Sequence, residues 1–252
     1  MKFENRIRRI LDHAFKGYYL EKYILKDGKT HPVAIICPGG GYWRVCSFVE
    51  GLPFARKLNA MGYSAIVVHY RCGSKYPYPV PQEDLARAIR HVLQHKDRWN
   101  LDMEGYSLWG ASAGGHLAAS FGTDAMGYKR YGLPKPGALI LSYPVVTMGE
   151  KAHEGSRKHL LGEDRTPHMI QFASIEKQIT ADYPPTFLWC GLEDRSVDPD
   201  NSRMLAEALK EWEIPHAFLT VADVGHGVGI GEGLACEGWF EKAVGFWESC
   251  RK

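Results

Sequence analysis

Tyr106-Ser107-Leu108-Trp109-Gly110-Ala111-Ser112-Ala113-Gly114 is an apolar run that ends in a glycine-flanked serine, and a helix-forming stretch from His116 to Ala119 follows it. This order predicts a strand, a tight turn and a helix, with Ser112 at the apex of the turn. Such a turn strains the serine backbone, so side chains two positions before and after it would collide with neighbouring chain unless both are glycine. The N–H of Ala113 then lies at a helix N-terminus, where negative charge is favoured. Ser112 is the predicted nucleophile.

The pentapeptide alone is equally compatible with a loop serine that caps a helix, so the surrounding chain must decide. Short apolar runs alternate with longer helical patterns on both sides of it. The predicted strands are Val33–Cys37, Ala65–Tyr70, Tyr106–Trp109, Ala138–Tyr143, Thr186–Cys190 and Ala217–Val221, with antiparallel edge strands within Tyr18–Leu25. The predicted helices are Val49–Met61, Pro81–Arg98, Ser112–Phe121, Pro199–Trp212 and Ala235–Cys250. This alternation predicts an α/β fold: a mostly parallel central sheet of about eight strands with helices on both faces.

Residues 144–185 interrupt the alternation, because they contain no clean strand but three histidines, several charges and the Pro184-Pro185 pair. An insertion after the strand that ends at Tyr143 would lie over the carboxyl ends of the strands, where ligands bind in open α/β sheets. We expect residues 1–252 to form a single domain, with 144–185 as a short lid.

The composition is that of an ordinary globular protein. The 252 residues are 45% hydrophobic, and 31 basic residues balance 29 acidic ones to a net charge of +2, which favours neither nucleic acid nor an anionic membrane as partner. The first ten residues, Arg8-Arg9 included, lack the apolar run of an export signal, and no stretch is apolar enough to span a membrane. The six cysteines show no paired spacing. We expect a cytoplasmic protein with reduced thiols; its oligomeric state, a homo-oligomer included, stays open.

A serine nucleophile needs a histidine base that a buried carboxylate orients. Among the eleven histidines, His226 fits best, because it follows the last predicted strand in the glycine-rich loop Asp223–Gly229. The alternative is an exposed turn histidine. His116 lies one helical turn beyond the serine and His216 begins a strand, so both are expected to be structural.

The carboxylate should follow a strand that ends near the serine. The strand Thr186–Cys190 leads into Gly191-Leu192-Glu193-Asp194-Arg195-Ser196-Val197-Asp198, and Asp194 is the predicted acid. Glu193 and Asp198 are rivals by position, and Asp198 is equally suited to cap the helix that follows Pro199.

A second glycine-rich loop, Pro38-Gly39-Gly40-Gly41-Tyr42, follows the first central strand. Consecutive glycines let backbone N–H groups approach a reacting carbonyl, so the predicted oxyanion hole consists of the N–H groups of Gly41 and Ala113, with Gly40 as the alternative donor. A turn unrelated to catalysis is the competing interpretation.

Two histidine pairs are candidate metal ligands. His91 and His95 are spaced i, i+4 on one helix, and His153 and His159 are close in the 144–185 segment. Neither pair carries a matching set of carboxylates or thiolates, so we predict no metal and no cofactor.

Most of the chain resembles the small carbohydrate-esterase branch of the α/β hydrolases, which includes acetylxylan-esterase-like and lipase/esterase-like proteins. The family's acid lies in an Asp-x-x-Val pattern, matched by Asp194 to Val197, and its histidine matches His226. Pro38 departs from the histidine of hormone-sensitive-lipase-like relatives, and Asp198 replaces a frequent proline, which leaves open which acid orients the imidazole. The markers of the resemblance are Pro38–Tyr42, Glu50-Gly51, Tyr70-Arg71, Gly110–Ala118, Gly155-Ser156, Leu160-Leu161-Gly162 and Pro184–Trp189.

These residues predict a serine hydrolase, and the resemblance implies a carboxylesterase that removes acetyl groups from small acylated sugars such as xylo-oligosaccharides through an acyl-enzyme. Tyr42, Trp43 and Tyr143, with Phe172 of the lid, are the expected substrate-binding residues, because aromatic rings would exclude long acyl chains and suit a sugar. An amide hydrolase, a peptidase or formamidase, is the alternative, and a non-catalytic binding protein is a third. Since the base must be neutral, activity should rise through about pH 6.5 to 7.

Overall fold

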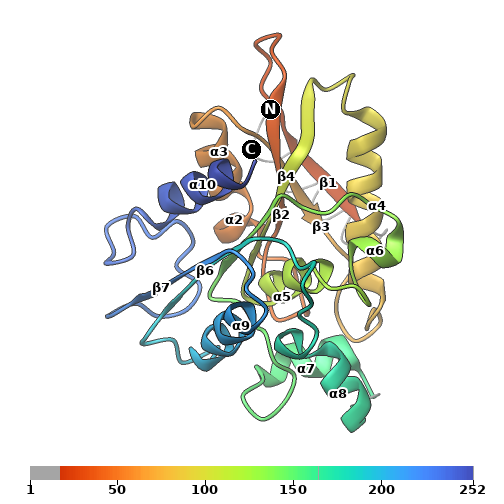
Figure 1. The fold of residues 1–252 in the computed structure, drawn as a ribbon, viewed down its shortest axis with the longest axis vertical. Helices are drawn as coiled ribbons and strands as arrows, with labels where there is room; N and C mark the ends of the chain where they lie inside the picture. The colour runs from red at the N-terminus through yellow and green to blue at the C-terminus, as the bar shows by residue number, and fades with distance from the viewer. Residues whose placement is uncertain (1–17, 164, 252) are drawn as a thin grey trace.

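The computed structural model describes residues 18–163 and 165–251, which build a seven-stranded sheet in the order β1-β3-β2-β4-β5-β6-β7 (Figure 1). β1 pairs antiparallel with β3, and every other neighbouring pair is parallel. The predicted α/β architecture is confirmed, with seven strands in place of about eight and one edge strand in place of several. The stretch from which an export signal was excluded lies outside the described residues.

Each strand of the central sheet reproduces a predicted apolar run within a few residues. The strands are β1 (Tyr19–Tyr23), β2 (His31–Cys37), β3 (Ser64–His69), β4 (Leu101–Ala111), β5 (Ala138–Ser142), β6 (Thr186–Gly191) and β7 (His216–Val221). The helices are α2 (Ser47–Glu50), α3 (Leu52–Ala60), α4 (Val80–His95), α5 (Ser112–Phe121), α6 (Tyr128–Tyr131), α7 (Glu154–Leu161), α8 (Pro167–Ala173), α9 (Asp200–Glu211) and α10 (Trp239–Cys250), with a 3₁₀ turn, η1, at Ile175–Lys177.

The sheet separates two hydrophobic cores, because successive side chains of a strand point to opposite faces. Ile35 and Cys37 of β2 belong to the core under α4, α5 and α9, whereas Ala34 and Ile36 belong to the core under α3 and α10. Both faces of the central strands are therefore buried, which is why their sequences are continuous apolar runs.

The helix predicted at Val49–Met61 is divided in two. α2 ends at Glu50 and α3 begins at Leu52, with the buried Gly51 between them. Pro53 is the cause, because proline has no N–H to donate and its ring would clash with the carbonyl four residues earlier in a continuous helix. The break leaves Glu50 at the end of a short helix, against the glycine-rich loop after β2.

The turn between β4 and α5 has the steric constraint that its sequence predicted. Ser112 has a φ of +53°. A Cβ atom on Gly110 would lie 2.3 Å from the carbonyl oxygen of Gly114, and one on Gly114 would lie 2.0 Å from the carbonyl oxygen of Cys37. Both contacts are with backbone that cannot move aside, so only glycine fits at these positions.

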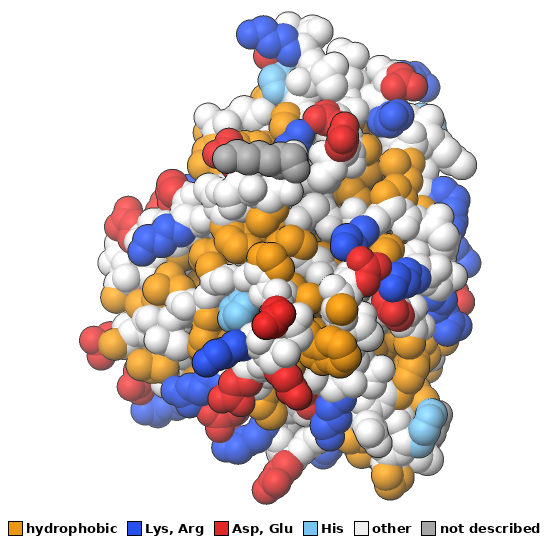
Figure 2. All heavy atoms as spheres, in the orientation of Figure 1, with side chains coloured by type: hydrophobic (Ala, Val, Ile, Leu, Met, Phe, Trp, Pro, Cys, Tyr) orange, Lys and Arg blue, Asp and Glu red, His pale blue; other side chains and the backbone are white. Residues whose placement is uncertain are grey.

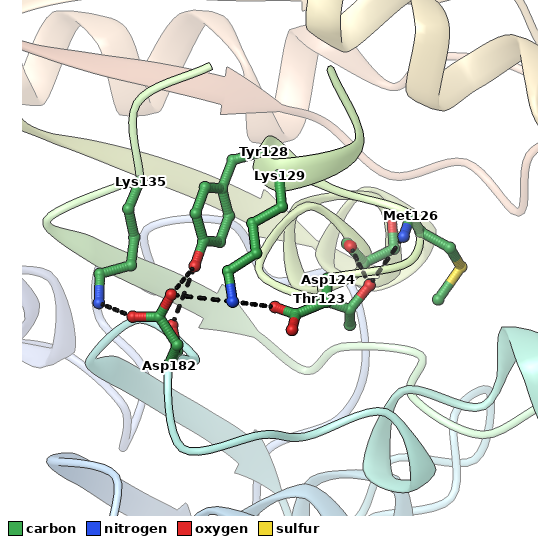
Figure 3. Close-up of polar contacts among 8 residues, drawn as sticks. Thr123, Asp124, Met126, Tyr128, Lys129, Lys135 and Asp182 are labelled. Carbon is green, nitrogen blue, oxygen red and sulfur yellow. Dashed lines mark hydrogen bonds and ion pairs between the residues drawn. The ribbon is translucent and has the colours of Figure 1, made fainter. Parts of the chain in front are cut away.

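The 144–185 segment folds as α7, α8 and η1, which lie beside α5 and α9 at one end of the molecule (Figure 1). Its return to β6 is fixed at Asp182, whose carboxylate accepts hydrogen bonds from the Tyr128 hydroxyl and the Lys135 ammonium, each at 2.7 Å, and pairs with Lys129 at 3.0 Å (Figure 3). These partners hold the pKa of Asp182 well below its ordinary value. The end of the segment that leads into β6 is thus tied to α6 and to the loop before β5.

Charged side chains of both signs share the face of the molecule that Figure 2 shows. On the face shown in Figure 2, basic and acidic side chains are interspersed rather than gathered into one patch. Of the helices in the described part of the chain, none has the length and apolar character needed to cross a bilayer.

Replacing the elbow glycine tests the steric constraint. Gly114→Ala should lower the free energy of unfolding by about 3 kcal/mol or more, because its methyl group would overlap a backbone oxygen. Gly245→Ala is the matched control: Gly245 is exposed within α10 and no atom lies within 4 Å of an added Cβ, so this change should stabilise the protein by about 0.5–1 kcal/mol. Denaturant unfolding of both variants measures the contrast; a Gly114→Ala protein as stable as the wild type would contradict it.

Candidate active site

The structure brings together a serine, a histidine and an aspartate that lie far apart in the sequence. Nε2 of His226 is 2.8 Å from Oγ of Ser112, and Nδ1 of His226 is 2.6 Å from Oδ2 of Asp194. A carboxylate can only accept, so Nδ1 carries the proton and Nε2 is free to accept from the serine hydroxyl. Ser112 follows β4, Asp194 follows β6 and His226 follows β7, so the three groups meet at the carboxyl edge of the sheet.

Asp194 is held by the turn that it begins. Its side chain is 1% exposed, and its second oxygen, Oδ1, accepts the N–H groups of Ser196 and Val197, both at 2.9 Å. This explains the Asp-x-x-Val spacing, because the turn fixes one oxygen and leaves the other for the imidazole. The rivals are elsewhere: Glu193 is exposed, and Asp198 pairs with Lys151 at 2.8 Å while accepting the N–H of Asp200 at the start of α9.

The glycine-rich loop after β2 lies directly beside the serine. Gly40 and Gly41 have φ values of +124° and +66°, and a Cβ atom on Gly39 would lie 2.7 Å from Cβ of Ser112. Among the described residues, the N–H groups of Gly40 and Gly41 have no acceptor, and both glycines line the cleft above the serine. The N–H of Ala113 belongs to the first turn of α5, where no acceptor exists within the helix. Gly40 and Gly41 thus offer unpaired N–H groups from the wall of the cleft, and Ala113 offers one from the residue that follows the serine.

Tyr42 differs from its expected role. We predicted that it contacts substrate, but it is 1% exposed and its hydroxyl is 2.9 Å from Nδ1 of His116. His116 also donates from Nε2 to the carbonyl of Ala173 at 2.8 Å, so this pair ties the glycine-rich loop to α5 and α8. Burial lowers the pKa of His116 to about 4, so it is neutral at pH 7, and its contribution to stability is lost as the pH falls from about 6.5 towards 4.

A buried carboxylate, Glu50, connects the two loops that carry the reactive groups. Glu50 is 3% exposed; its Oε2 accepts the N–H of Gly39 at 2.7 Å and its Oε1 accepts the hydroxyl of Tyr143 at 3.0 Å. The same hydroxyl accepts the N–H of Gly229, in the His226 loop, at 3.1 Å. Burial raises the pKa of Glu50, and the two hydrogen bonds oppose that rise. In the sequence, Glu50 is one of the residues that resemble the carbohydrate esterases, but no role could be predicted for it.

Tyr143 therefore supports the site from behind rather than lining it. It is 1% exposed, and its ring packs edge-on against the imidazole of His226, with the ring centroids 4.9 Å apart. We predicted contact with substrate; its φ of +38° instead directs the side chain into the core under α3 and α10.

The cleft over the serine has a volume of about 440 Å³. Trp43 is 61% exposed and lines it, whereas Phe172 packs against Tyr78 and does not line it. His153 and His159, the histidine pair of the 144–185 segment, also line the cleft. The one sequence signal that could have placed them here is their position in the 144–185 segment, which was predicted to lie over the site.

The structure also places the histidine pair of α4, His91 and His95. Across residues 18–163 and 165–251, no group of three or more His, Cys, Asp or Glu side chains is arranged to hold a metal ion. The rings of His91 and His95 pack against one another at a tilt of 39°, and His95 stacks with Trp99.

A sequence profile of the alpha/beta hydrolase fold matches residues 36–229. The chain is 31% identical to endo-1,4-beta-xylanase B of Butyrivibrio fibrisolvens, over 94% of this chain and 40% of that protein. It is 30% identical to an acetylxylan esterase of Xylanibacter ruminicola, over 64% of this chain and 33% of that protein. It thus spans less than half the length of these two relatives.

A solved structure shares both the fold and part of the sequence. The acetyl ester-xyloside bifunctional hydrolase of Caldicellulosiruptor lactoaceticus superposes with a TM-score of 0.84 and 34% identity, covering 92% of this chain and 88% of that one. These similarities confirm the resemblance that the sequence motifs indicated.

Removing one hydroxyl tests the connection between the loops. Tyr143→Phe should lower the free energy of unfolding by about 1–3 kcal/mol, because Gly229 N–H loses its acceptor. It should also slow labelling of Ser112 by a serine-directed fluorophosphonate about ten- to hundredfold, because both loops shift.

Tyr183→Phe is the matched control for that variant. It removes another buried hydroxyl, which donates to the carbonyl oxygen of Ala119 at a distance of 2.8 Å. Neither of these residues lines the cleft. It should cost similar stability and leave the labelling rate unchanged; equal labelling rates in both variants would show that Tyr143 does not support the site.

Proposed function

Because this chain belongs to the alpha/beta hydrolase fold family, we propose that it is a serine carboxylesterase that removes acetyl groups from carbohydrates. The observation that carries this proposal is the unbroken line of hydrogen bonds from Asp194 through His226 to Ser112, which ends in an open cleft beside unpaired backbone donors. That arrangement combines an activated nucleophile with stabilisation of a developing oxyanion.

The reaction follows from the positions of these groups. Nε2 of His226 takes the proton of the Ser112 hydroxyl as its oxygen attacks the ester carbonyl, and the N–H groups of Gly41 and Ala113 stabilise the oxyanion, with Gly40 beside them. Asp194 stabilises the imidazolium without accepting its proton. The imidazolium then protonates the departing alcohol, and water attacks the acyl-enzyme by the same route.

A short acyl group fits the walls of the cleft. Among the described residues, the cleft has only two large apolar side chains in its lining, Trp43 and Val49, and they stand beside glycines and polar residues such as Arg44 and Ser196. Two large side chains are enough to contact an acetyl group, whereas a long fatty chain would need a longer row of them to bury its length. The relatives named as acetylxylan esterase and acetyl ester-xyloside hydrolase support a sugar acetate as substrate. In this proposal residues 144–185 cover the cleft within a single domain.

Substituting the carboxylates tests the assignment of the acid. Ser112→Ala should reduce kcat on p-nitrophenyl acetate by about 10⁴-fold or more, and Asp194→Asn by about 10⁴-fold, because the imidazole loses the partner that fixes its tautomer. Asp198→Asn is the control and should change kcat by less than about twofold, since its contacts are with Lys151 and the start of α9. Steady-state kinetics of the three proteins decides; an active Ser112→Ala protein would exclude the mechanism.

Acyl length and bond type test the substrate class. Over a p-nitrophenyl series from acetate to octanoate, kcat/KM should be highest for acetate and about a hundredfold lower for octanoate, because Trp43 and Val49 are the only large apolar side chains in the described part of the chain that line the cleft. The matched amide, p-nitroacetanilide, should be cleaved at least about 10³-fold more slowly than the acetate. A preference for octanoate would contradict the acetyl assignment, and comparable rates on the anilide would favour the amide hydrolase.

A further inference from the structure

Two imidazoles from the 144–185 segment face the cleft beside the nucleophile. His153 and His159 line it together with Ser112 and His226. Both rings lie against Gly41: Nδ1 of His159 is 3.1 Å from its carbonyl oxygen, and a Cβ atom built on this glycine would lie 3.5 Å from Cε1 of His153. The pair is therefore on the wall next to the proposed oxyanion hole.

The tautomer of His153 is fixed by the start of α7. Its Nδ1 accepts the backbone N–H of Ser156 at 3.2 Å and lies 2.8 Å from the hydroxyl of the same residue. An atom that accepts from an N–H cannot itself carry a proton, so the ring proton is on Nε2. Burial and the nearby His226 lower the pKa of His153, which keeps the ring neutral. Nε2 has no partner among the described residues, so His153 presents a hydrogen-bond donor to the cleft.

His159 has the opposite tautomer. Its Nδ1 faces the carbonyl oxygen of Gly41, which can only accept, so Nδ1 carries the proton. In the neutral ring Nε2 is then an acceptor, and it too has no partner in the part of the chain that the structure describes. The two rings present one donor and one acceptor to the same space.

We propose that His153 and His159 form a subsite for hydroxyl groups on the alcohol part of the substrate. This inference rests on the proposed function and deepens it. A hydroxyl both donates and accepts, so one sugar hydroxyl, or two on adjacent carbons, satisfies both ring nitrogens at once. The acetyl group has no hydroxyl, which assigns the pair to the alcohol. Trp43, exposed on the same cleft, offers a flat apolar face to the ring that bears these hydroxyls.

An asparagine at each position separates the subsite from the structural hydrogen bonds. In His153→Asn the amide oxygen can still accept the N–H of Ser156, and asparagine is a favourable residue at a helix start. In His159→Asn the amide N–H₂ can still donate to the carbonyl of Gly41. Each variant therefore keeps the contact made by Nδ1 and removes the group presented by Nε2. His168→Asn, at an exposed position in α8, is the matched control.

Two acetates that differ in hydroxyl groups test the subsite. One is a monoacetate of methyl β-xylopyranoside, and the other is cyclohexyl acetate, which has the same acyl group on a ring without hydroxyls. The wild type should prefer the xyloside in kcat/KM, and His153→Asn and His159→Asn should each reduce that preference about tenfold, the loss of one buried hydrogen bond. His168→Asn should keep the wild-type preference.

The outcomes separate this inference from the proposed function. If the asparagine variants lose activity equally on both acetates, or if the wild type shows no preference, the hydroxyl subsite is excluded, while Ser112-dependent hydrolysis of either acetate leaves the esterase proposal standing. If the wild type hydrolyses neither acetate, the proposed function fails and the inference fails with it. Circular dichroism and denaturant midpoints of the variants identify any loss that comes from unfolding.

Discussion

The close approach of α5 to the carboxyl end of β2 is the constraint on which the site depends. The backbone of Gly114 passes so near the carbonyl of Cys37 that no side chain fits between them. Because the serine begins α5 and the glycine-rich loop continues β2, this one contact sets the distance from the nucleophile to the backbone donors. The histidine and the aspartate only have to reach a point that the backbone has already fixed. Rigid main chain rather than side-chain packing therefore positions the first reacting atom.

Much of this arrangement could be predicted from the sequence, for physical reasons. The central strands are buried on both faces, so their apolar runs are unambiguous, and the glycines at 110 and 114 are required by sterics. Asp194 was chosen over its rivals because its pattern matched a family, and the structure shows the turn that this pattern encodes. The prediction of one continuous helix across Gly51 was wrong, although Pro53, which breaks a helix, is visible in the sequence.

The errors have a common origin in positive φ angles and long-range partners. Tyr42 and Tyr143 have φ values of +55° and +38°, which non-glycine residues seldom adopt and which no sequence pattern announces. An aromatic residue beside a catalytic loop has the same sequence signature whether it faces a ligand or the core. Glu50 was equally invisible, because its partners at positions 39 and 143 come together only in the folded chain.

The bond from His159 to the carbonyl of Gly41 has a consequence for how such proteins diversify. It makes the inserted segment part of the scaffold of the glycine-rich loop as well as a wall of the cleft. A protein in which this segment was exchanged for another would gain a new wall for its cleft. In the same step it would lose the hydrogen bond that holds the carbonyl of Gly41 beside the nucleophile. Substitutions within the segment that keep a donor for that carbonyl would avoid this loss, and replacement of the whole segment would need a donor from elsewhere in the chain.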